Sequence, residues 1–270
     1  MPTDRHQAAR PAPLAHLTWP KVPANPLVLV PVGATEQHGP HLPLHTDSVI
    51  ATAVARSVAA ELSAVLAPTI AYGASGEHAG FPGTVSIGRD ALRVVLVETV
   101  RSLSTWAGRT VFVNGHGGNV STLDAAVGSL RHEGHDVAWL GCEVPGGDAH
   151  AGRTETSLML HLAPADVRLA EAVPGDTRPL ADLLPELMAQ GVRHVSPTGV
   201  LGDPAGATAS EGRALLASMV SAALSRVSAG CTGRHGRLVA TSEECVCVPP
   251  CRGGSLTSAP PATLPKEGHS

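Results

Sequence analysis

The chain alternates between short apolar runs and longer segments in which apolar residues recur at helical spacing. The short runs are rich in valine, leucine and isoleucine, which is typical of buried strands. They lie at 27–32, 65–70, 110–113 and 136–140. The longer segments predict amphipathic helices. These helices are expected at 47–62, 90–106, 119–133, 154–162 and 207–227, with Thr46 or Asp47 capping the first and Asp90 the second.

The order of these elements predicts the fold class. Strands that alternate with helices imply a parallel sheet with right-handed crossovers, and therefore a layered α/β domain. Hydrophobic residues make up 43% of the 270 positions but aromatic residues only 2%, so the core has to be aliphatic. Such a core suits parallel strands covered by helices better than an aromatic-rich sandwich.

Composition divides the chain into three parts. Residues 1–25 contain several prolines and no continuous apolar core, so we expect a flexible N-terminal segment. Residues 26–228 carry the predicted strands and helices and form the folded domain. In 229–270, Gly, Pro, Ser, Thr and Cys dominate, which predicts a disordered tail. Its Cys245, Cys247 and Cys251 do not have the spacing of a standard zinc site.

Charge and hydropathy exclude several partners. The net charge is −4 with no basic block, so nothing recommends nucleic acid as a partner. No apolar run is long enough to span a bilayer, and the N-terminus does not resemble a signal peptide. Cys142 is the only cysteine in the body of the chain. A cytoplasmic protein with no membrane partner is the resulting expectation.

The first cluster of chemically interesting residues follows the first predicted strand. Glu36 and His38 lie two positions apart, so in an extended segment their side chains face the same way. Asp47, at the start of the next helix, can return its carboxylate to the same place. An aspartate there is also a routine helix cap. Taken together with its two neighbours, we interpret it as a metal ligand, because oxygen and nitrogen donors hold divalent transition metals.

A glycine-rich loop after the third strand supplies a second cluster. Asn114-Gly-His116-Gly-Gly-Asn119 opens a helix, and helix N-termini also bind phosphate. Neither a Lys-Ser/Thr pair nor the full dinucleotide-binding spacing is present, however. We therefore interpret His116 as a further ligand.

The remaining candidates follow the fourth strand and the second. Glu155 lies in a first helical turn, where a glutamate usually compensates the helix dipole. We nevertheless count it as a fifth donor, because two metals with open positions need five donors, with one aspartate shared. His150 is the candidate to stabilise or protonate a tetrahedral intermediate, although a surface or supporting histidine is the alternative. Glu77 and His78, in a flexible glycine-rich loop, are candidates to line the substrate pocket.

These segments together resemble the creatininase family of metal-dependent amidohydrolases. The similarity extends over about residues 26–228 in the family's order, and the combination of motifs is highly specific. The matching stretches are 32–44 with Thr46-Asp47, 76–84, 113–119, 150–157 and 202–209. Segments 68–78 and 199–204 are most similar to the branch whose members remove a modified C-terminal dipeptide from a ribosomally made precursor peptide. The resemblance implies a creatininase-like α/β/α fold with a mainly parallel sheet.

The resemblance also implies a ligand set for two divalent metal ions per subunit. Glu36, Asp47 and His116 would bind one ion, and His38, the shared Asp47 and Glu155 the other. In creatininase itself the last glutamate lies two residues after the glycine-loop histidine, where this chain has Gly118. This departure makes creatinine an improbable substrate. Mixed oxygen and nitrogen donors suit Zn, Mn or Fe(II).

Three functions remain open at this point. The first is a peptidase acting on the precursor peptide, with a water molecule activated between two metals attacking the amide. The second is a related amidohydrolase acting on a small cyclic or formylated amide. The third is a catalytically silent metal-binding protein. The family's usual state is a homohexamer, so a homo-oligomer is expected.

Overall fold

A four-stranded parallel sheet forms the centre of the molecule. The computed structural model describes residues 13–240, and the strand order is β2-β1-β3-β4. The strands are β1 (Leu27–Val32), β2 (Val65–Leu66), β3 (Arg109–Asn114) and β4 (Val137–Gly141). All three pairings are parallel. β1 coincides with its predicted run, β3 extends its run by one residue at each end, and β4 is shifted by one residue. β2 covers only the first two residues of its run.

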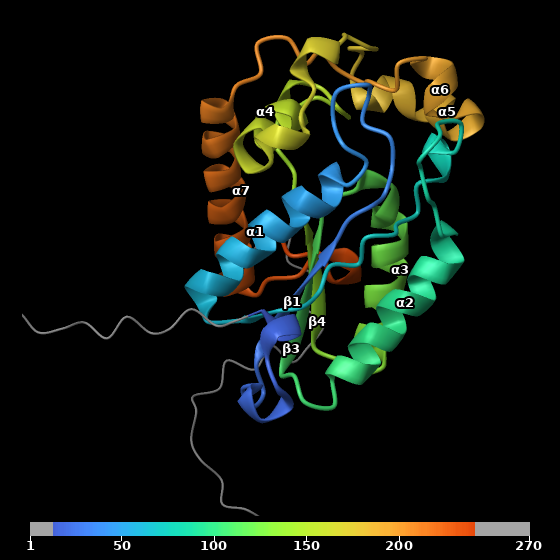
Figure 1. Cartoon of the computed structure of the whole chain (residues 1–270). Coiled ribbons are helices and arrows are strands. Elements are labelled where there is room, and N and C mark those ends of the chain that lie inside the picture. Colours follow the sequence, from blue (N-terminus) through green and yellow to red (C-terminus); the bar gives the residue numbers. More distant parts are fainter. Residues whose placement is uncertain (1–12, 241–270) are drawn as a thin grey trace, which may run out of the picture.

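Helices cover both faces of this sheet, as Figure 1 shows. The helices α1 (Thr46–Leu62), α4 (Arg153–Leu162) and α7 (Ala209–Ala229) share one apolar cluster with alternate strand residues such as Leu29 and Val111. The helices α2 (Gly88–Leu103) and α3 (Val120–His132) share the other, with Val28 and Phe112. The layered α/β fold that the pattern predicted is confirmed, and its core is aliphatic apart from a few large side chains such as Phe112.

Two local details differ from the sequence-based expectation. The second strand ends after Leu66, because the chain reaches Pro68, which has no backbone N–H for a ladder. Beyond Leu66, the backbone N–H of Ala67 donates to the carbonyl of Leu29, and an isolated bridge joins Ile70 to Val32. The predicted helix caps are also wrong. His45 precedes α1 and Ile87 precedes α2, and neither side chain makes a capping hydrogen bond.

A third apolar cluster, which the sequence analysis did not predict, lies beyond the sheet. It is built by α5 (Leu180–Gln190) and α6 (Val192–Val195), which lie together at the upper right of Figure 1. Leu183, Leu187 and Val192 are buried there against Leu201. Pro185 inside α5 and the positive φ of Gly191 interrupt the helical pattern, which explains why neither helix was predicted.

The described ends of the chain are ordered against the body. Leu14 packs on the cluster that contains α2 and α3. At the other end, Leu238 is buried, and its backbone N–H donates to the carbonyl of Trp139. The predicted tail therefore does not begin at residue 229 in the described part of the chain. The tail cysteines from Cys245 onward lie outside the described residues. No helix within 13–240 has the length and apolarity needed to cross a membrane.

Candidate metal centre

The carboxyl ends of the three longer strands are level with one another. Val32 at the end of β1 pairs with Asn114 at the end of β3, and Asn114 pairs with Gly141 at the end of β4. The segments that leave these ends carry the polar residues identified in the sequence. Because α1 begins at the same edge of the sheet, Asp47 in its first turn joins them. This edge is where parallel α/β sheets place their sites.

Asp47 lies between two histidines. Its Oδ1 is 3.0 Å from Nε2 of His38, and its Oδ2 is 3.3 Å from Nδ1 of His116. The residue is only 2% exposed. Its two oxygens thus face different histidines, which is the arrangement that a carboxylate shared by two ions would need. The geometry explains why Asp47 does not act as a helix cap.

On the His116 side, Glu36 completes a group of three donors. Its Oε1 is 3.2 Å from Nδ1 of His116. Donor atoms of Glu36, Asp47 and His116 all lie within 4.8 Å of one another, and all three residues are buried. This is the set that the resemblance implied for one ion.

On the His38 side, the donors are His38, His150 and Glu155, again within 4.8 Å of one another. Oε2 of Glu155 is 3.8 Å from Nε2 of His38, and it accepts a hydrogen bond from the backbone N–H of Ala151 at 2.6 Å. Ala151 has a φ of 53°, a conformation unusual for a residue with a side chain. The N–H of this residue thus holds the carboxylate of Glu155 in place. His150, predicted to act in proton transfer, lies among the donors.

Hydrogen bonds to backbone carbonyls orient the imidazoles. Nδ1 of His38 donates to the carbonyl of Glu36 at 3.1 Å, and Nε2 of His116 donates to that of Ala74 at 3.3 Å. In the neutral form of each ring, which is the form that binds a metal, the other nitrogen carries the lone pair and faces the centre. Metal-binding histidines are commonly held in this way.

The glycine loop is held by its own asparagines rather than by an anion. The side-chain amide of Asn119 donates to the carbonyl of Gly33, and its Oδ1 accepts from the backbone of Ala74. The side chain of Asn114 donates to the carbonyl of His116 at 2.7 Å. These contacts tie the loop to the first strand and fix the position of His116.

Three carboxylate oxygens at the centre are placed to suit a cation. Among the described residues, both oxygens of Glu36 and Oδ2 of Asp47 are buried and accept no hydrogen bond. A buried carboxylate without compensation costs several kcal/mol. Divalent cations would compensate both groups at once, so the residues present fit a metal centre.

The close approach of buried carboxylates and imidazoles also shifts the pKa values of these groups. Burial opposes the charge of Glu36, but His116 outweighs it, and the pKa of Glu36 falls to about 2. Burial opposes the charge of His38, but Asp47 and Glu155 outweigh it and raise that pKa to about 10. At Glu155, burial prevails and raises the pKa to about 7. In the metal-free protein, protons on imidazoles thus take the place of cations.

The structure places His78 deeper than the sequence suggested. It is 4% exposed, and its Nε2 is 3.5 Å from Oε1 of Glu36. The loop around it forms a short 3-10 helix at Gly76–His78. Sequence reasoning gave no role to Gln37, which is also buried and contacts both His78 and His150. Its position between two predicted ligands was the only available signal.

Gly118 leaves space for Glu77. A Cβ atom at position 118 would lie 2.4 Å from Oε1 of Glu77, 2.4 Å from Nε2 of His116 and 2.5 Å from the carbonyl oxygen of Ala74. A glutamate cannot occupy this position without displacing the histidine. The departure from creatininase noted in the sequence therefore has a steric counterpart in the structure.

The centre opens into a cavity of about 1010 Å³. Glu36, His116 and His150 line it on the side of the metal centre, together with Glu77 and His78. Helix α5 lines it as well and contributes apolar side chains, which are Leu180, Leu184, Leu187 and Met188. A cavity of this size accommodates a ligand larger than a single small amide.

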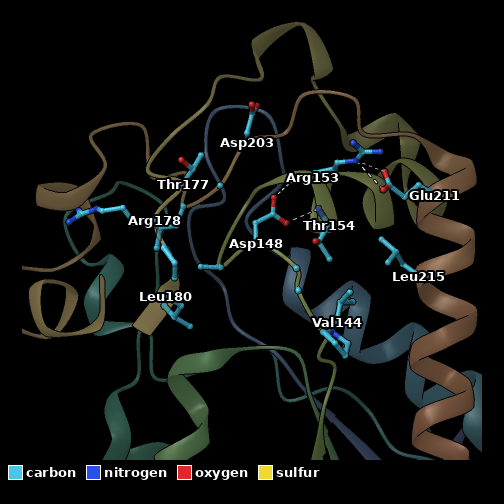
Figure 2. A pocket seen from close by; sticks show the side chains of 17 residues that line it. Val144, Asp148, Arg153, Thr154, Thr177, Arg178, Leu180, Asp203, Glu211 and Leu215 are labelled. Atoms are coloured by element: carbon cyan, nitrogen blue, oxygen red, sulfur yellow. Dashed lines mark hydrogen bonds and ion pairs between the residues drawn. The ribbon is translucent and has the colours of Figure 1, made fainter. Parts of the chain in front are cut away.

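A second cavity of about 530 Å³, drawn in Figure 2, lies next to the first. The two share Ala149, Leu180 and Leu201 in their linings. Arg153 and Asp148 also line the second cavity, but none of the predicted site residues does.

Comparisons with known proteins agree with this geometry. Residues 15–227 match the sequence model of creatininase, described as creatinine amidohydrolase. The chain is 57% identical over 219 residues to the mycofactocin precursor peptide peptidase of Mycolicibacterium smegmatis, which covers 79% of this chain and 89% of that protein. Two solved structures share its fold at 30% identity. A Mn form of creatininase has a TM-score of 0.63 and covers 77% of this chain and 94% of that one. A creatininase mutant of the Zn-Zn type has a TM-score of 0.59, with 73% and 87% covered.

Proposed function

The chain belongs to the creatininase family, and from this membership we propose that it is a metal-dependent peptidase acting on the modified mycofactocin precursor peptide. The bond cleaved is the amide that joins the modified C-terminal dipeptide to the rest of the peptide. One observation carries the proposal. A buried aspartate, Asp47, presents one oxygen to His38 and the other to His116 beside a large cavity.

The proposed centre contains two divalent ions per subunit, of zinc, manganese or iron(II). Glu36, Asp47 and His116 are the ligands for one, and His38, Asp47 and Glu155 for the other. Its support is the set of buried carboxylate oxygens that accept no hydrogen bond. Bound there, the ions would polarise the substrate carbonyl and lower the pKa of water enough to make it nucleophilic at neutral pH.

His150 is the proposed proton carrier. Its Nε2 donates to the backbone carbonyl of Gln37 at 2.8 Å, so the lone pair is on Nδ1, which lies 3.8 Å from Oε1 of Glu36. Burial, and then the charge of His38, hold the pKa of His150 well below its usual range. The ring is therefore neutral, with a lone pair at Nδ1 for a proton from the attacking water, and its lowered pKa favours giving that proton up again. It then returns this proton to the departing amine, as a general base and acid.

The cavity supports a peptide rather than a small amide as substrate. Helix α5 offers a wall of partly exposed leucines and Met188, which is 80% exposed. An apolar wall suits the side chains of a peptide better than the small polar ring of creatinine. Glu77 and His78 line the same cavity and are proposed to contact the substrate.

Assembly into a homo-oligomer, a hexamer by resemblance to the family, is part of the proposal. Light scattering coupled to size-exclusion chromatography measures the mass in solution, and a monomer at working concentration would contradict it.

The test of the proposed function combines metal analysis with hydrolysis. The zinc-, manganese- and iron(II)-loaded proteins are incubated with the modified precursor peptide, with creatinine and with a formylated amine. We expect mass spectrometry to detect release of the C-terminal dipeptide and no turnover of creatinine. Asp47→Asn should lose the activity, whereas Asp124→Asn on α3 should keep it. Two bound ions with no hydrolysis of any amide would favour a silent metal-binding protein, and turnover of only a small amide would favour the related amidohydrolase.

A further inference from the structure

The four imidazoles at the centre do not present the same atom to it. His38, His116 and His150 each donate an N–H to a backbone carbonyl, which in the neutral ring leaves a lone pair facing inward. His78 has a different partner. Its outer nitrogen, Nδ1, lies 2.8 Å from the side-chain nitrogen of Gln37, which is a donor. Nδ1 of His78 is therefore the acceptor, and its hydrogen has to be on Nε2.

The orientation of the Gln37 amide is fixed by its surroundings. Oε1 accepts from the backbone N–H of Gly39 at 2.9 Å, and Nε2 donates to the carbonyl of Gly199 at 3.0 Å. Turning the amide over would place oxygen against the carbonyl oxygen and nitrogen against the N–H. Gln37 is 5% exposed, and a Cβ on Gly199 would lie 1.9 Å from its Oε1. The side chain thus has a single arrangement.

The two hydrogens of the Gln37 amide are then fully assigned. One goes to the carbonyl of Gly199 and the other to Nδ1 of His78. Nε2 of His150 lies 3.1 Å from the same amide nitrogen but 2.8 Å from the carbonyl of Gln37, to which it donates. One residue therefore fixes both rings: its backbone carbonyl holds His150, and its side chain holds His78.

We propose that Gln37 is a positioning residue that makes His78 a hydrogen-bond donor to the reacting carbonyl oxygen rather than a metal ligand. The tautomers follow from the hydrogen bonds alone, and only the catalytic role rests on the proposed function. Although His78 lies with Glu36 and His150 in a group that could hold an ion, a ring that carries hydrogen on its inward nitrogen offers no lone pair there. Its Nε2 is 3.5 Å from Oε1 of Glu36, longer than a usual hydrogen bond. The residue also lines the substrate cavity.

In the proposed reaction, the N–H of His78 would face the oxygen on which charge develops when the amide carbonyl becomes tetrahedral. A preorganised donor at such a position typically contributes about 10²–10³-fold to kcat. His150, with its lone pair at Nδ1, accepts and returns the proton. Gln37 thereby keeps one ring as donor and the other as acceptor on the same side of the centre.

The first arm of the test needs no variant and no substrate. Two-bond proton–nitrogen spectra of the zinc-loaded protein, labelled at histidine, report which nitrogen of each ring carries hydrogen. His78→Gln and His150→Gln spectra assign the two signals. We expect hydrogen on Nε2 of both rings and no zinc at His78. Hydrogen on Nδ1 of His78, or zinc bound to it, would overturn the proposal.

The second arm uses variants. Gln37→Glu keeps the shape of the side chain and its acceptor for Gly39, but its carboxylate would accept from Nδ1 of His78 and turn the inward nitrogen into an acceptor. We expect two bound ions, an inverted His78 tautomer and a kcat lower by about 10²–10³-fold. The Tm should fall, because an oxygen would replace the nitrogen that donates to the carbonyl of Gly199. His78→Leu should lower kcat by as much. The double variant, Gln37→Glu with His78→Leu, should lower kcat no more than either single change.

Thr52→Val is the matched control. Thr52 lies on α1, the helix that carries Asp47, and the change removes its partly buried hydrogen bond to Thr69. It should keep the wild-type kcat. A folded, metal-loaded His78→Leu protein with kcat within about twofold of the wild type would overturn the catalytic role. If Gln37→Glu fails to fold, the wild-type spectrum and His78→Leu decide the question. Because the spectra require no turnover, failure of the inference and failure of the proposed substrate are distinguishable.

Discussion

Two cavities share a wall in this molecule, and their charged groups are organised in opposite ways. In the cavity of Figure 2, Asp148 accepts hydrogen bonds from the backbone of Arg153 and Thr154. Arg153 pairs with Glu211 at 2.9 Å, and Arg178 pairs with Asp176 and Glu186 at 2.6 and 3.2 Å. In the neighbouring cavity, Glu36 has two buried oxygens that accept no hydrogen bond.

We interpret the difference as one between charges whose partners lie within the protein and charges whose partner would be a ligand. A carboxylate whose oxygens are satisfied by neighbouring N–H groups has no further need of a cation. A buried carboxylate without such partners carries a free-energy cost that something else has to offset. Cavity size and polarity alone do not make this distinction, since both cavities are partly polar. The two kinds of carboxylate are distinguished by the hydrogen bonds that each of them accepts.

The largest expected effect comes from removing the shared carboxylate. Asp47→Asn keeps the size of the side chain but loses the charge that faces both His38 and His116. We expect both ions to be lost and kcat/KM to fall by about 10³-fold or more, since metal catalysis supplies several kcal/mol of stabilisation. Steady-state hydrolysis with metal analysis measures both. Undiminished hydrolysis in the variant would remove the basis for a two-metal centre.

A smaller effect is expected from filling the space beside the glycine loop. The methyl group of Gly118→Ala would lie 2.4 Å from Nε2 of His116. Displacing that ring should weaken metal affinity by about 10–100-fold. Gly117→Ala is the control, because a Cβ there meets nothing within 4 Å. Isothermal titration of the metal-free proteins compares the two, and equal affinities would show that position 118 does not constrain His116.

The pH dependence of metal binding should have a defined sign. In the metal-free protein the pKa of His38 is raised to about 10, and that of His116 lies well above its usual range, so both rings are protonated at neutral pH. A metal binds the neutral ring, so affinity should rise with pH by about tenfold per unit for each proton released. Metal titrations between about pH 6 and 9 measure this slope of affinity against pH. An affinity independent of pH would contradict the assignment of these rings as ligands.

The raised pKa of His38 also makes the stability of the metal-free protein depend on pH. A raised histidine pKa stabilises the folded state fully below the unfolded value of 6.5, and the contribution is lost as pH rises through about 10. The Tm of the metal-free protein should therefore fall over this range through the contribution of His38. The metal-loaded protein should not show this loss, because the cation replaces the proton.

The smallest effect is expected in the cavity of Figure 2. Arg178→Gln removes an exposed ion pair with Asp176. Exposed pairs contribute little, so kcat/KM should stay within about twofold of the wild type and metal content should not change. A large loss of activity would mean that the cavity of Figure 2 takes part in catalysis, and that ion-paired charges do not mark a cavity without a catalytic role.

Much of the fold was predictable because local patterns determine it. The apolar runs that became β1, β3 and β4 are buried on both faces, so their composition alone indicates strands. The failures have local causes too. Pro68 shortens the second strand, and Pro185 obscures α5. The end of the domain was misjudged because Leu238 is a single apolar residue among polar ones, and its burial depends on Trp139.

The site, like the fold, has some features that the sequence predicts and others that it does not. Glu36, His38 and Asp47 are close in sequence, so their convergence could be inferred from strand and helix geometry. The role of Gln37 could not, because its contacts are to His78, His150 and Gly199, at sequence separations of 41, 113 and 162 residues. Whether Asp47 caps a helix or faces two histidines likewise depends on His116, which only the folded sheet brings near.

The most direct test of the central claim is the electron paramagnetic resonance spectrum of the manganese-loaded protein. If Asp47 bridges two ions, they lie about 3.5–4 Å apart, as in other two-metal sites. The account predicts the spectrum of an exchange-coupled manganese pair, and its disappearance in Asp47→Asn. A protein that binds two manganese ions per subunit but gives only the spectrum of magnetically isolated ions would contradict it.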